Sequence, residues 1–315
     1  MFVNCCHIII ENAPGKKALD FFKVNEVEVK SSNKTFTDTC IIKLPRKLKI
    51  LNGDINQVIK RGAKVTVRLG YDFKLVEEFT GYVARVNAEI PFTIECEDEM
   101  WQLKQQTFTK SFGRVKVKDV ISHIWKGKSK VVDLTIGGLV VKEWSGAKVL
   151  EELKKYGLRA YFRSGVLIVD FAGSQQAGKR IYYNFQRNII DPQLEYSRQD
   201  DLRIRIKGVS KFRNGKVVEA LVGDKGGDLR TLHYVELEKS DLEKVIKQEL
   251  ERLKYDGYKG SFKTFGLPVI KPGDTAVLDD PEYLERKGSY QVEEVITTFN
   301  MDGYRRTISP ERRIA

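Results

Sequence analysis

Cysteine and histidine are scarce in this 315-residue sequence, which has four cysteines and three histidines. They are scattered through the chain without a CxxC pair: Cys5, Cys6, Cys40, Cys96, His7, His123 and His233. A metal site is therefore not expected. The first two cysteines and the first histidine are adjacent, but neighbouring residues of a strand point to opposite faces, so the pattern favours buried thiols over a ligand cluster.

Long apolar runs are also absent. Runs such as His7–Ile10 and Val166–Val169 fall far short of the roughly 18 residues that a membrane-spanning helix needs. The first residues have no basic leader, and their apolar stretch is too short and strand-like for a secretory signal, so synthesis in the cytoplasm is expected. We predict no membrane segment.

Motifs of catalysis and phosphate binding are missing as well. The densest carboxylate cluster is formed by Glu95, Glu97, Asp98 and Glu99, and its alternation with apolar residues predicts a solvated strand end. A hydrolase would instead need two carboxylates that face one cleft. Asp279-Asp280-Pro281 predicts a turn, Ser164 lacks a GxSxG context, and Gly223–Gly227 lacks the P-loop pattern. We expect that the protein is not an enzyme and that it has no catalytic residue and no cofactor site.

Positive charge is in excess, with 55 Lys and Arg against 43 Asp and Glu and a net charge of +12. Such an excess fits a nucleic-acid ligand or an acidic protein neighbour. No zinc-finger, RNP or basic-helix signature is present, and the basic residues are spread over expected strands and turns. We interpret them as a solvated or interfacial surface: Lys43, Arg46, Lys47, Lys49, Arg203, Arg205, Lys207, Arg305, Arg306, Arg312 and Arg313.

The first hundred residues alternate between apolar and polar positions. Val65, Val67 and Leu69 alternate with polar residues, and Ile94 and Cys96 do the same. Many such segments in series, without helices between them, predict an antiparallel barrel or sandwich.

A similar train of expected strands returns near the C-terminus. Residues 62–98 and 272–311 share the order of their turn residues, and a Leu-Pro step precedes each train, at Leu44-Pro45 and Leu267-Pro268. In each, a Gly and a Tyr begin the next strand, at Gly81-Tyr82 and at Gly288 with Tyr290. We interpret the two trains as two copies of one β-module.

The period changes to that of helices between the two trains. Apolar residues from Val117 to Trp125 predict an amphipathic helix that ends at Gly127, and a second helix follows over 147–156. Ser145 is its expected N-cap and Gly157 its stop. Ser164-Gly165 predicts a tight hairpin turn, and the polar segment 173–178 a turn or linker.

One long helix is expected inside the second train. Ser240 and Glu243 have capping-box spacing before an apolar stripe that runs up to Gly257. The predicted fold is mainly β with an α+β insert: two related antiparallel β-barrel-like tube modules flank a small α+β domain. The predicted domains are a first tube module at 1–108, the α+β domain at 109–185, and a second tube module at 186–315 with its helix at about 240–256.

This order of parts resembles the late control protein D family of tail hub proteins. The family occurs in baseplates of contractile-tailed phages, such as Mu-like phages, and in the hub half of type VI secretion spike proteins. The stretches that carry the resemblance are VTVRLGYDFKLVEEFTGYV (65–83), CEDEMWQLK (96–104), VLEELKKYGLRAYFRSGVLIV (149–169), GLPVIKPGDTAVL (266–278) and GSYQVEEV (288–295). Each is degenerate alone; their order and spacing across the chain carry the resemblance.

The resemblance implies a structural hub. Three copies would form a ring of six similar modules that joins a sixfold tail tube to a threefold spike. It implies a homotrimer, contacts with tail tube and other baseplate proteins, DNA only in passage, synthesis in the bacterial cytoplasm, and assembly into a virion tail or phage-like particle. Family members can carry a fused needle or lysozyme domain; since this sequence ends at Ala315, the spike and any cell-wall enzyme are expected to be separate proteins.

Two other classes of function remain open from the sequence. A basic nucleic-acid-binding β-barrel protein would show DNA affinity that falls steeply with salt. A cell-wall polysaccharide hydrolase would turn over peptidoglycan.

Overall fold

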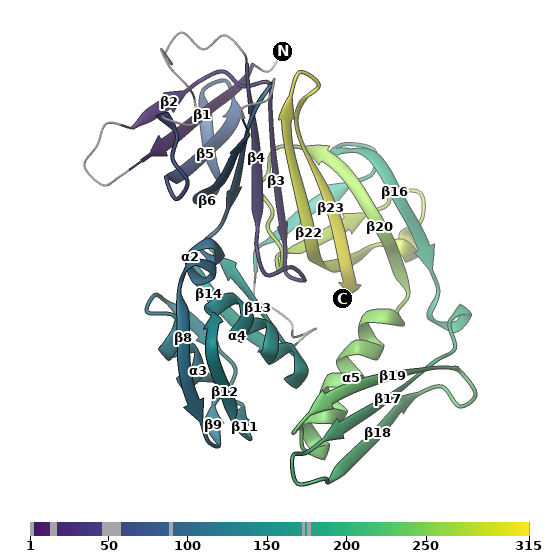
Figure 1. Cartoon of the computed structure of the whole chain (residues 1–315). Helices are drawn as coiled ribbons and strands as arrows, with labels where there is room; N and C mark the ends of the chain where they lie inside the picture. The colour runs from purple at the N-terminus through teal and green to yellow at the C-terminus, as the bar shows by residue number, and fades with distance from the viewer. Residues whose placement is uncertain are drawn as a thin grey trace.

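The computed structural model describes residues 3–12, 18–45, 58–87, 91–171, 174 and 178–314 (Figure 1). Strands predominate, and the mainly-β class with α+β parts is confirmed. Most strands belong to one large sheet, and two smaller α+β units lie on the same side of it (Figure 1). The large sheet follows an open path, whose ends are β16 and β2.

The first β-module contains seven strands. Its strands are β1 (Asn4–Glu11), β2 (Leu19–Phe21), β3 (Glu26–Ser32), β4 (Thr39–Leu44), β5 (Lys64–Tyr71), β6 (Lys74–Asn87) and β7 (Phe92–Glu97). Six of them pair in the order β3-β4-β7-β6-β5-β1, and β2 extends β1. Alternating residues such as Val65, Val67 and Ile94 are fully buried, as the period of two predicts.

The second β-module repeats that order with six strands. They are β15 (Arg180–Asn184), β16 (Ile189–Ser197), β20 (Gly257–Phe265), β21 (Thr275–Asp279), β22 (Gly288–Asn300) and β23 (Gly303–Arg313). They pair as β16-β20-β23-β22-β21-β15, which matches β3-β4-β7-β6-β5-β1 strand for strand. One direction differs: β1 is antiparallel to β5, whereas β15 is parallel to β21.

A bulge recurs at the same place in both modules. The register of β6 against β7 shifts between Val83 and Arg85, and that of β22 against β23 shifts between Val292 and Glu294. Bulges are retained features of a fold. The shared strand order and the shared bulge support the duplication that the sequence predicts.

The two modules are parts of one sheet because β22 pairs with β3. The antiparallel ladder runs from Glu294 opposite Ser32 to Phe299 opposite Val27. Figure 1 shows these strands side by side in the middle of the sheet, although they are far apart in the chain.

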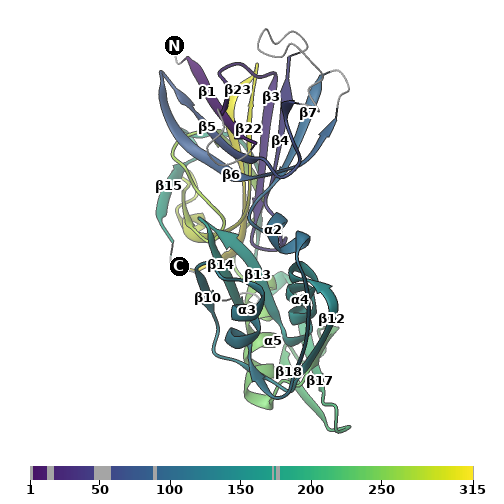
Figure 2. The same ribbon diagram turned by 60° about the vertical axis from the view of Figure 1, so that its left-hand side comes forward.

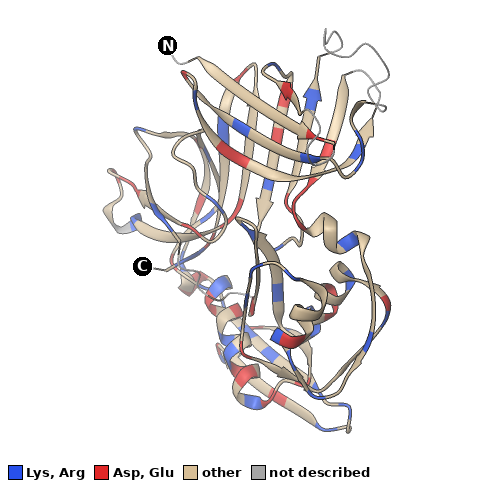
Figure 3. Ribbon diagram, turned by 90° about the vertical axis from the view of Figure 1, so that its left-hand side faces the viewer, with Lys and Arg blue, Asp and Glu red and all other residues tan. Residues whose placement is uncertain are grey.

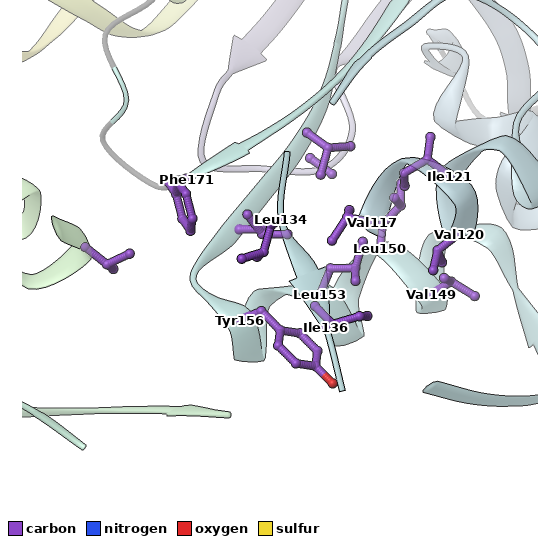
Figure 4. Close-up of a cluster of buried hydrophobic side chains, with 14 of the residues drawn as sticks. Val117, Val120, Ile121, Leu134, Ile136, Val149, Leu150, Leu153, Tyr156 and Phe171 are labelled. Atoms are coloured by element: carbon purple, nitrogen blue, oxygen red, sulfur yellow. The ribbon is translucent and has the colours of Figure 1, made fainter. Parts of the chain in front are cut away.

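The first α+β unit follows β7. Its elements are α2 (Met100–Gln105), β8 (Thr107–Phe112), β9 (Val115–Lys116), α3 (Val117–Ile124), β10 (Ser129–Val131), β11 (Thr135–Ile136), β12 (Leu139–Ser145), α4 (Gly146–Leu153), β13 (Leu158–Arg163) and β14 (Val166–Phe171). Their apolar side chains point inward to one core (Figure 4). The Ser145 cap is confirmed, because its hydroxyl accepts a hydrogen bond from the Lys148 amide at 3.2 Å.

Two turns of this unit also follow the sequence prediction. A short 3-10 turn after α4 ends at Gly157, whose φ of 74° is in the left-handed region that glycine favours. The hairpin of β13 and β14 turns at Ser164 and Gly165, whose φ values are 49° and 74°. Positive φ at both positions is the geometry of a tight two-residue hairpin.

The second α+β unit interrupts the second module between β16 and β20. It consists of β17 (Ile204–Lys211), β18 (Val217–Gly223), β19 (Asp228–Val235) and α5 (Lys239–Leu253). The helix packs closely on β17: a Cβ added at Gly208 would lie 2.8 Å from Ile246. One hydrophobic cluster runs through both α+β units, so the long helix belongs to the packing beneath the sheet. Figure 2 shows the two units from another side.

The predicted capping box of the long helix is wrong. The helix begins at Lys239, one residue before Ser240, and Glu238 stands at the N-cap without a side-chain cap bond. Since Ser240 is already helical, its hydroxyl cannot cap the first turn.

The division of the chain at residues 108 and 185 stays a prediction. The pairing of β15 with β21 favours placing 180–184 with the second module. Most of the predicted linker at 173–178 lies outside the described residues. Among the described residues, no helix is long and apolar enough to span a membrane.

Candidate functional site

The two β-modules meet in a contact that contains several ion pairs and hydrogen bonds between distant parts of the chain. On its surface, Lys30 of β3 pairs with Glu294 of β22 at 3.2 Å. Lys34, just after β3, pairs with Glu293 of β22. The ladder between β22 and β3 and these two ion pairs fix the register of the joint.

A buried ion pair lies behind this ladder. Arg306 of β23 donates to Glu78 of β6 at 2.5 Å, and both side chains are almost completely buried. The guanidinium also donates to the Gly266 carbonyl at 2.6 Å and to Thr297 at 2.8 Å. Each of the three guanidinium nitrogens therefore donates at least one hydrogen bond, which is the condition for tolerating a buried charge.

Two tyrosines complete the buried contact. Tyr304 donates to the same Glu78 oxygen, and burial raises the pKa of its hydroxyl. Tyr71 of the first module donates to the Tyr304 carbonyl at 2.7 Å and accepts from the Gly266 amide at 3.2 Å. Each module supplies partners that the other leaves unpaired, so the joint specifies one relative position of the two modules.

The first α+β unit is attached to the second module by two ion pairs. Arg159 of β13 donates through both terminal nitrogens to Glu311 of β23, each at 3.1 Å. Arg163, at the end of the same strand, pairs with Asp274 at 2.5 Å. Both carboxylates are buried, so these pairs hold the unit in place beneath the sheet.

A half-enclosed cavity of about 270 Å³ lies where the modules and the first α+β unit meet. Two carboxylates face each other there. The ladder of β4 and β7 places Thr39 opposite Glu97, and one step further the Asp98 amide donates to the Asp38 carbonyl at 3.1 Å. Asp98 Oδ1 accepts from the Met100 amide at 3.1 Å, whereas its Oδ2 is buried without a partner.

The pKa values of these opposed carboxylates are raised. Burial raises the pKa of Asp38 to about 6. Burial, followed by the charge of Asp38, raises the pKa of Asp98 well above its usual range. Two like charges held opposite each other on a ladder oppose ionisation of both. The sequence prediction that Asp98 is solvated is therefore wrong, because the first α+β unit covers the end of β7.

Glu99 lines the same cavity, and burial raises its pKa. Glu95, Glu97 and the cysteines follow their predictions more closely. Glu95 and Glu97 lie half-buried on the face opposite Ile94 and Cys96. The thiols of Cys6, Cys40 and Cys96 are buried, and Cys5 is half-buried. In the part of the chain that the structure describes, no three His, Cys, Asp or Glu side chains form a group that could hold a metal ion.

The basic residues that the sequence assigned to a surface fall into two groups. Arg203 is exposed, and Arg205, Lys207, Arg305 and Arg313 are partly exposed. Arg306 and Arg312 are buried inside the single chain, which corrects the surface assignment for these two. Arg46, Lys47 and Lys49 lie outside the described residues. Figure 3 shows basic and acidic residues interspersed over the strands.

Sequence reasoning missed the joint itself. Glu78 and Tyr71 carry no motif, and their partners in β23 are more than 220 residues away. Glu78 is buried beside the buried Phe79, where the register of β6 against β5 shifts by one residue. A buried carboxylate within a strand is the one local signal that a distant cation is needed.

The comparisons with known proteins come from structure alone. No family model matches the sequence, and no curated protein matches it. The 43 kDa tail protein of prophage MuSo2 from Shewanella oneidensis is 16% identical, with a TM-score of 0.64 over 97% of this chain and 98% of that one. A tail protein from Neisseria meningitidis MC58 is 12% identical, with a TM-score of 0.65 over 98% and 96%.

A third similar structure comes from Escherichia coli. It is a component of the type VI secretion system that is structurally similar to the T4 bacteriophage tail proteins gp27 and gp5. It is 9% identical, with a TM-score of 0.61 over 98% of this chain and 79% of that one. The chain has the fold of these tail and secretion proteins, which confirms at the level of the fold the resemblance that the sequence shows.

Proposed function

We propose that this chain is a structural hub protein of a contractile phage tail or a phage-like injection baseplate, and that it acts as a homotrimer. Three chains carry six modules, which form a ring of pseudo-sixfold symmetry between the tail tube and the central spike. One observation carries the proposal: two modules with the same strand order are consecutive segments of one sheet.

The physical argument is one of repetition. The joint between β22 and β3 is a head-to-tail contact, since it uses different strands of the two modules. Head-to-tail contacts that repeat form either a closed ring or an open filament. A ring of six modules closes when the joint inside the chain alternates with a similar joint between chains.

The partners follow from the two faces of such a ring. A sixfold face matches a tail tube protein, and the threefold composition matches a separate trimeric spike. The solved structures that share this fold include Francisella PdpA-VgrG complexes and the type VI secretion component, which support a spike as a partner. DNA would pass through the ring without being read.

The test is the mass of the assembly in solution. We expect a trimer of the 36.1 kDa chain, either alone or after addition of the spike and tube proteins encoded with it, measured by light scattering and mass photometry. A chain that stays monomeric at high concentration with both partners present contradicts the proposal.

A further inference from the structure

We propose that Arg85 of one chain pairs with Glu195 of the next chain, in a joint between β6 and β16 that copies the joint between β22 and β3. The inference rests on the proposed ring, and it names the residues that select which modules meet. Four steps carry it.

The first step is that β6 and β22 are equivalent. Val83 of β6 exchanges backbone hydrogen bonds with Ala63 and Gly62, at 2.9 and 2.8 Å. Val292 of β22 exchanges the same two bonds with Asp274 and Gly273, at 2.9 and 2.7 Å. The bulge follows at once in both strands. Arg85 in the first module therefore occupies the position of Glu294 in the second.

The second step is that the corresponding edge of β6 has no strand partner among the described residues. After Val292, the edge of β22 that does not face β23 pairs with β3. After Val83, residues 84–87 of β6 pair with β7 along one edge. Along the other edge, which is equivalent to the edge of β22 that pairs with β3, no described strand pairs with them. A strand with unpaired amide and carbonyl groups is a template for another strand.

The third step identifies the strand that fits there. Ile42 of β4 and Phe262 of β20 are equivalent, since each is fully buried opposite an equivalent isoleucine, Ile94 and Ile308. Their other neighbours are Val27 of β3 and Pro192 of β16. Strand β16 is thus the second module's copy of β3, and it pairs on one side only, with β20.

The fourth step is that the charges at the equivalent positions of the two joints are complementary. With Val27 matched to Pro192, Lys30 of β3 matches Glu195 of β16. Inside the chain the pair is Lys30 with Glu294 at 3.2 Å; between chains the equivalent pair is Glu195 with Arg85. The signs are exchanged, but each pair joins opposite charges. Both Arg85 and Glu195 are exposed in the single chain.

The exchange of signs selects the order of modules around the ring. Two first modules that met would place Arg85 against Lys30, and two second modules would place Glu294 against Glu195. Juxtaposed like charges weaken a contact and so exclude wrong partners. Only alternation of first and second modules satisfies both joints, and alternation is what a closed trimer needs.

The test is a charge exchange. We expect Arg85→Glu and Glu195→Arg each to raise the concentration for half-assembly by about tenfold or more, because each places like charges together. The double exchange should return it to within about threefold of the wild type. Lys225→Glu, in the exposed turn between β18 and β19, is the matched control and should leave the concentration for half-assembly unchanged. Every variant should keep the monomer's unfolding temperature, because neither residue is buried.

A second measurement does not depend on charge. The register of Val295 opposite Ser31 predicts Val86 opposite Tyr196 between chains. With Val86→Cys and Tyr196→Cys in the same chain, oxidation should give covalent dimers and trimers, and neither single variant should.

The outcomes separate the two levels of the proposal. Trimers that form normally in both single exchanges, or a double exchange that restores nothing and no cross-link, overturn this joint while the hub function stands. A wild-type chain that does not assemble with its tail partners overturns the hub function, and this joint with it.

Discussion

Asp38 and Asp98 show how the covering of a strand end changes the chemistry of single residues. In an isolated strand the two carboxylates would be solvated and ionised. Here they face each other in a half-enclosed cavity bounded by another part of the chain, and one oxygen of Asp98 has no hydrogen-bond partner. The pKa values of both are raised, first by burial, so the folded chain holds protons that the unfolded chain releases.

That proton uptake predicts how stability depends on pH. A carboxyl whose pKa is raised on folding stabilises the fold below its unfolded pKa, and the contribution is lost as the pH rises through the folded value. For Asp38 this window runs from its ordinary value of 3.8 to about 6. We expect Asp98→Asn to raise the unfolding temperature at pH 8 and to flatten the decline of the unfolding temperature as the pH rises above 3.8.

Thermal unfolding over a pH series measures this effect. Asp228→Asn, at the exposed start of β19, serves as the control and should leave the slope unchanged. If Asp98→Asn lowers stability at pH 8, the opposed carboxylates are not the source of strain that their geometry indicates.

At the scale of elements, two helices with similar sequence signals have different beginnings. Ser145 lies before α4 in extended backbone, and its hydroxyl accepts the Lys148 amide. Ser240 is inside α5, whose N-cap is Glu238. Spacing alone did not distinguish the two, because the start of α5 depends on how the helix packs on β17 and β18.

This difference predicts the effect of removing each hydroxyl. Ser145→Ala should destabilise the chain by about 1 kcal/mol, the usual cost of losing an N-cap. Ser240→Ala should change stability by no more than about 0.5 kcal/mol, because the residue is exposed and caps nothing. Urea unfolding of both variants gives the comparison, and equal losses would argue against the assigned start of α5.

At the scale of the whole molecule, positive and negative side chains are mixed over the strands and helices. Many lysines and arginines contact carboxylates on neighbouring elements, as Lys43 of β4 does with Glu26 of β3 and Lys104 of α2 with Glu97 of β7, and Figure 3 shows the two signs interspersed. Such a surface attracts DNA weakly and without sequence preference.

We therefore expect DNA binding to be weak at physiological salt, with a dissociation constant no tighter than about the micromolar range of non-specific binding. A fluorescence anisotropy titration at increasing salt measures both the affinity and its slope. Tight binding that persists at roughly 0.15 M salt, the physiological ionic strength, would favour the nucleic-acid-binding alternative over the hub.

The sequence by itself determined the local elements and the repeat. Alternation of apolar residues fixes which face of a strand is buried, and Gly157 and Gly165 stand where only a left-handed backbone continues the chain. These signals act between residues close in sequence. The duplication was visible for the same reason, since the two modules share the order of their turn residues.

Only the tertiary structure decided how the parts meet. The pairing of Arg306 with Glu78, the pairing of β22 with β3 and the burial of Asp98 join segments that are distant in the chain. A charged residue reads the same in a sequence whether water or a buried partner surrounds it. The energy of a charge depends on what the fold places next to it, and that placement is a property of the whole packed molecule.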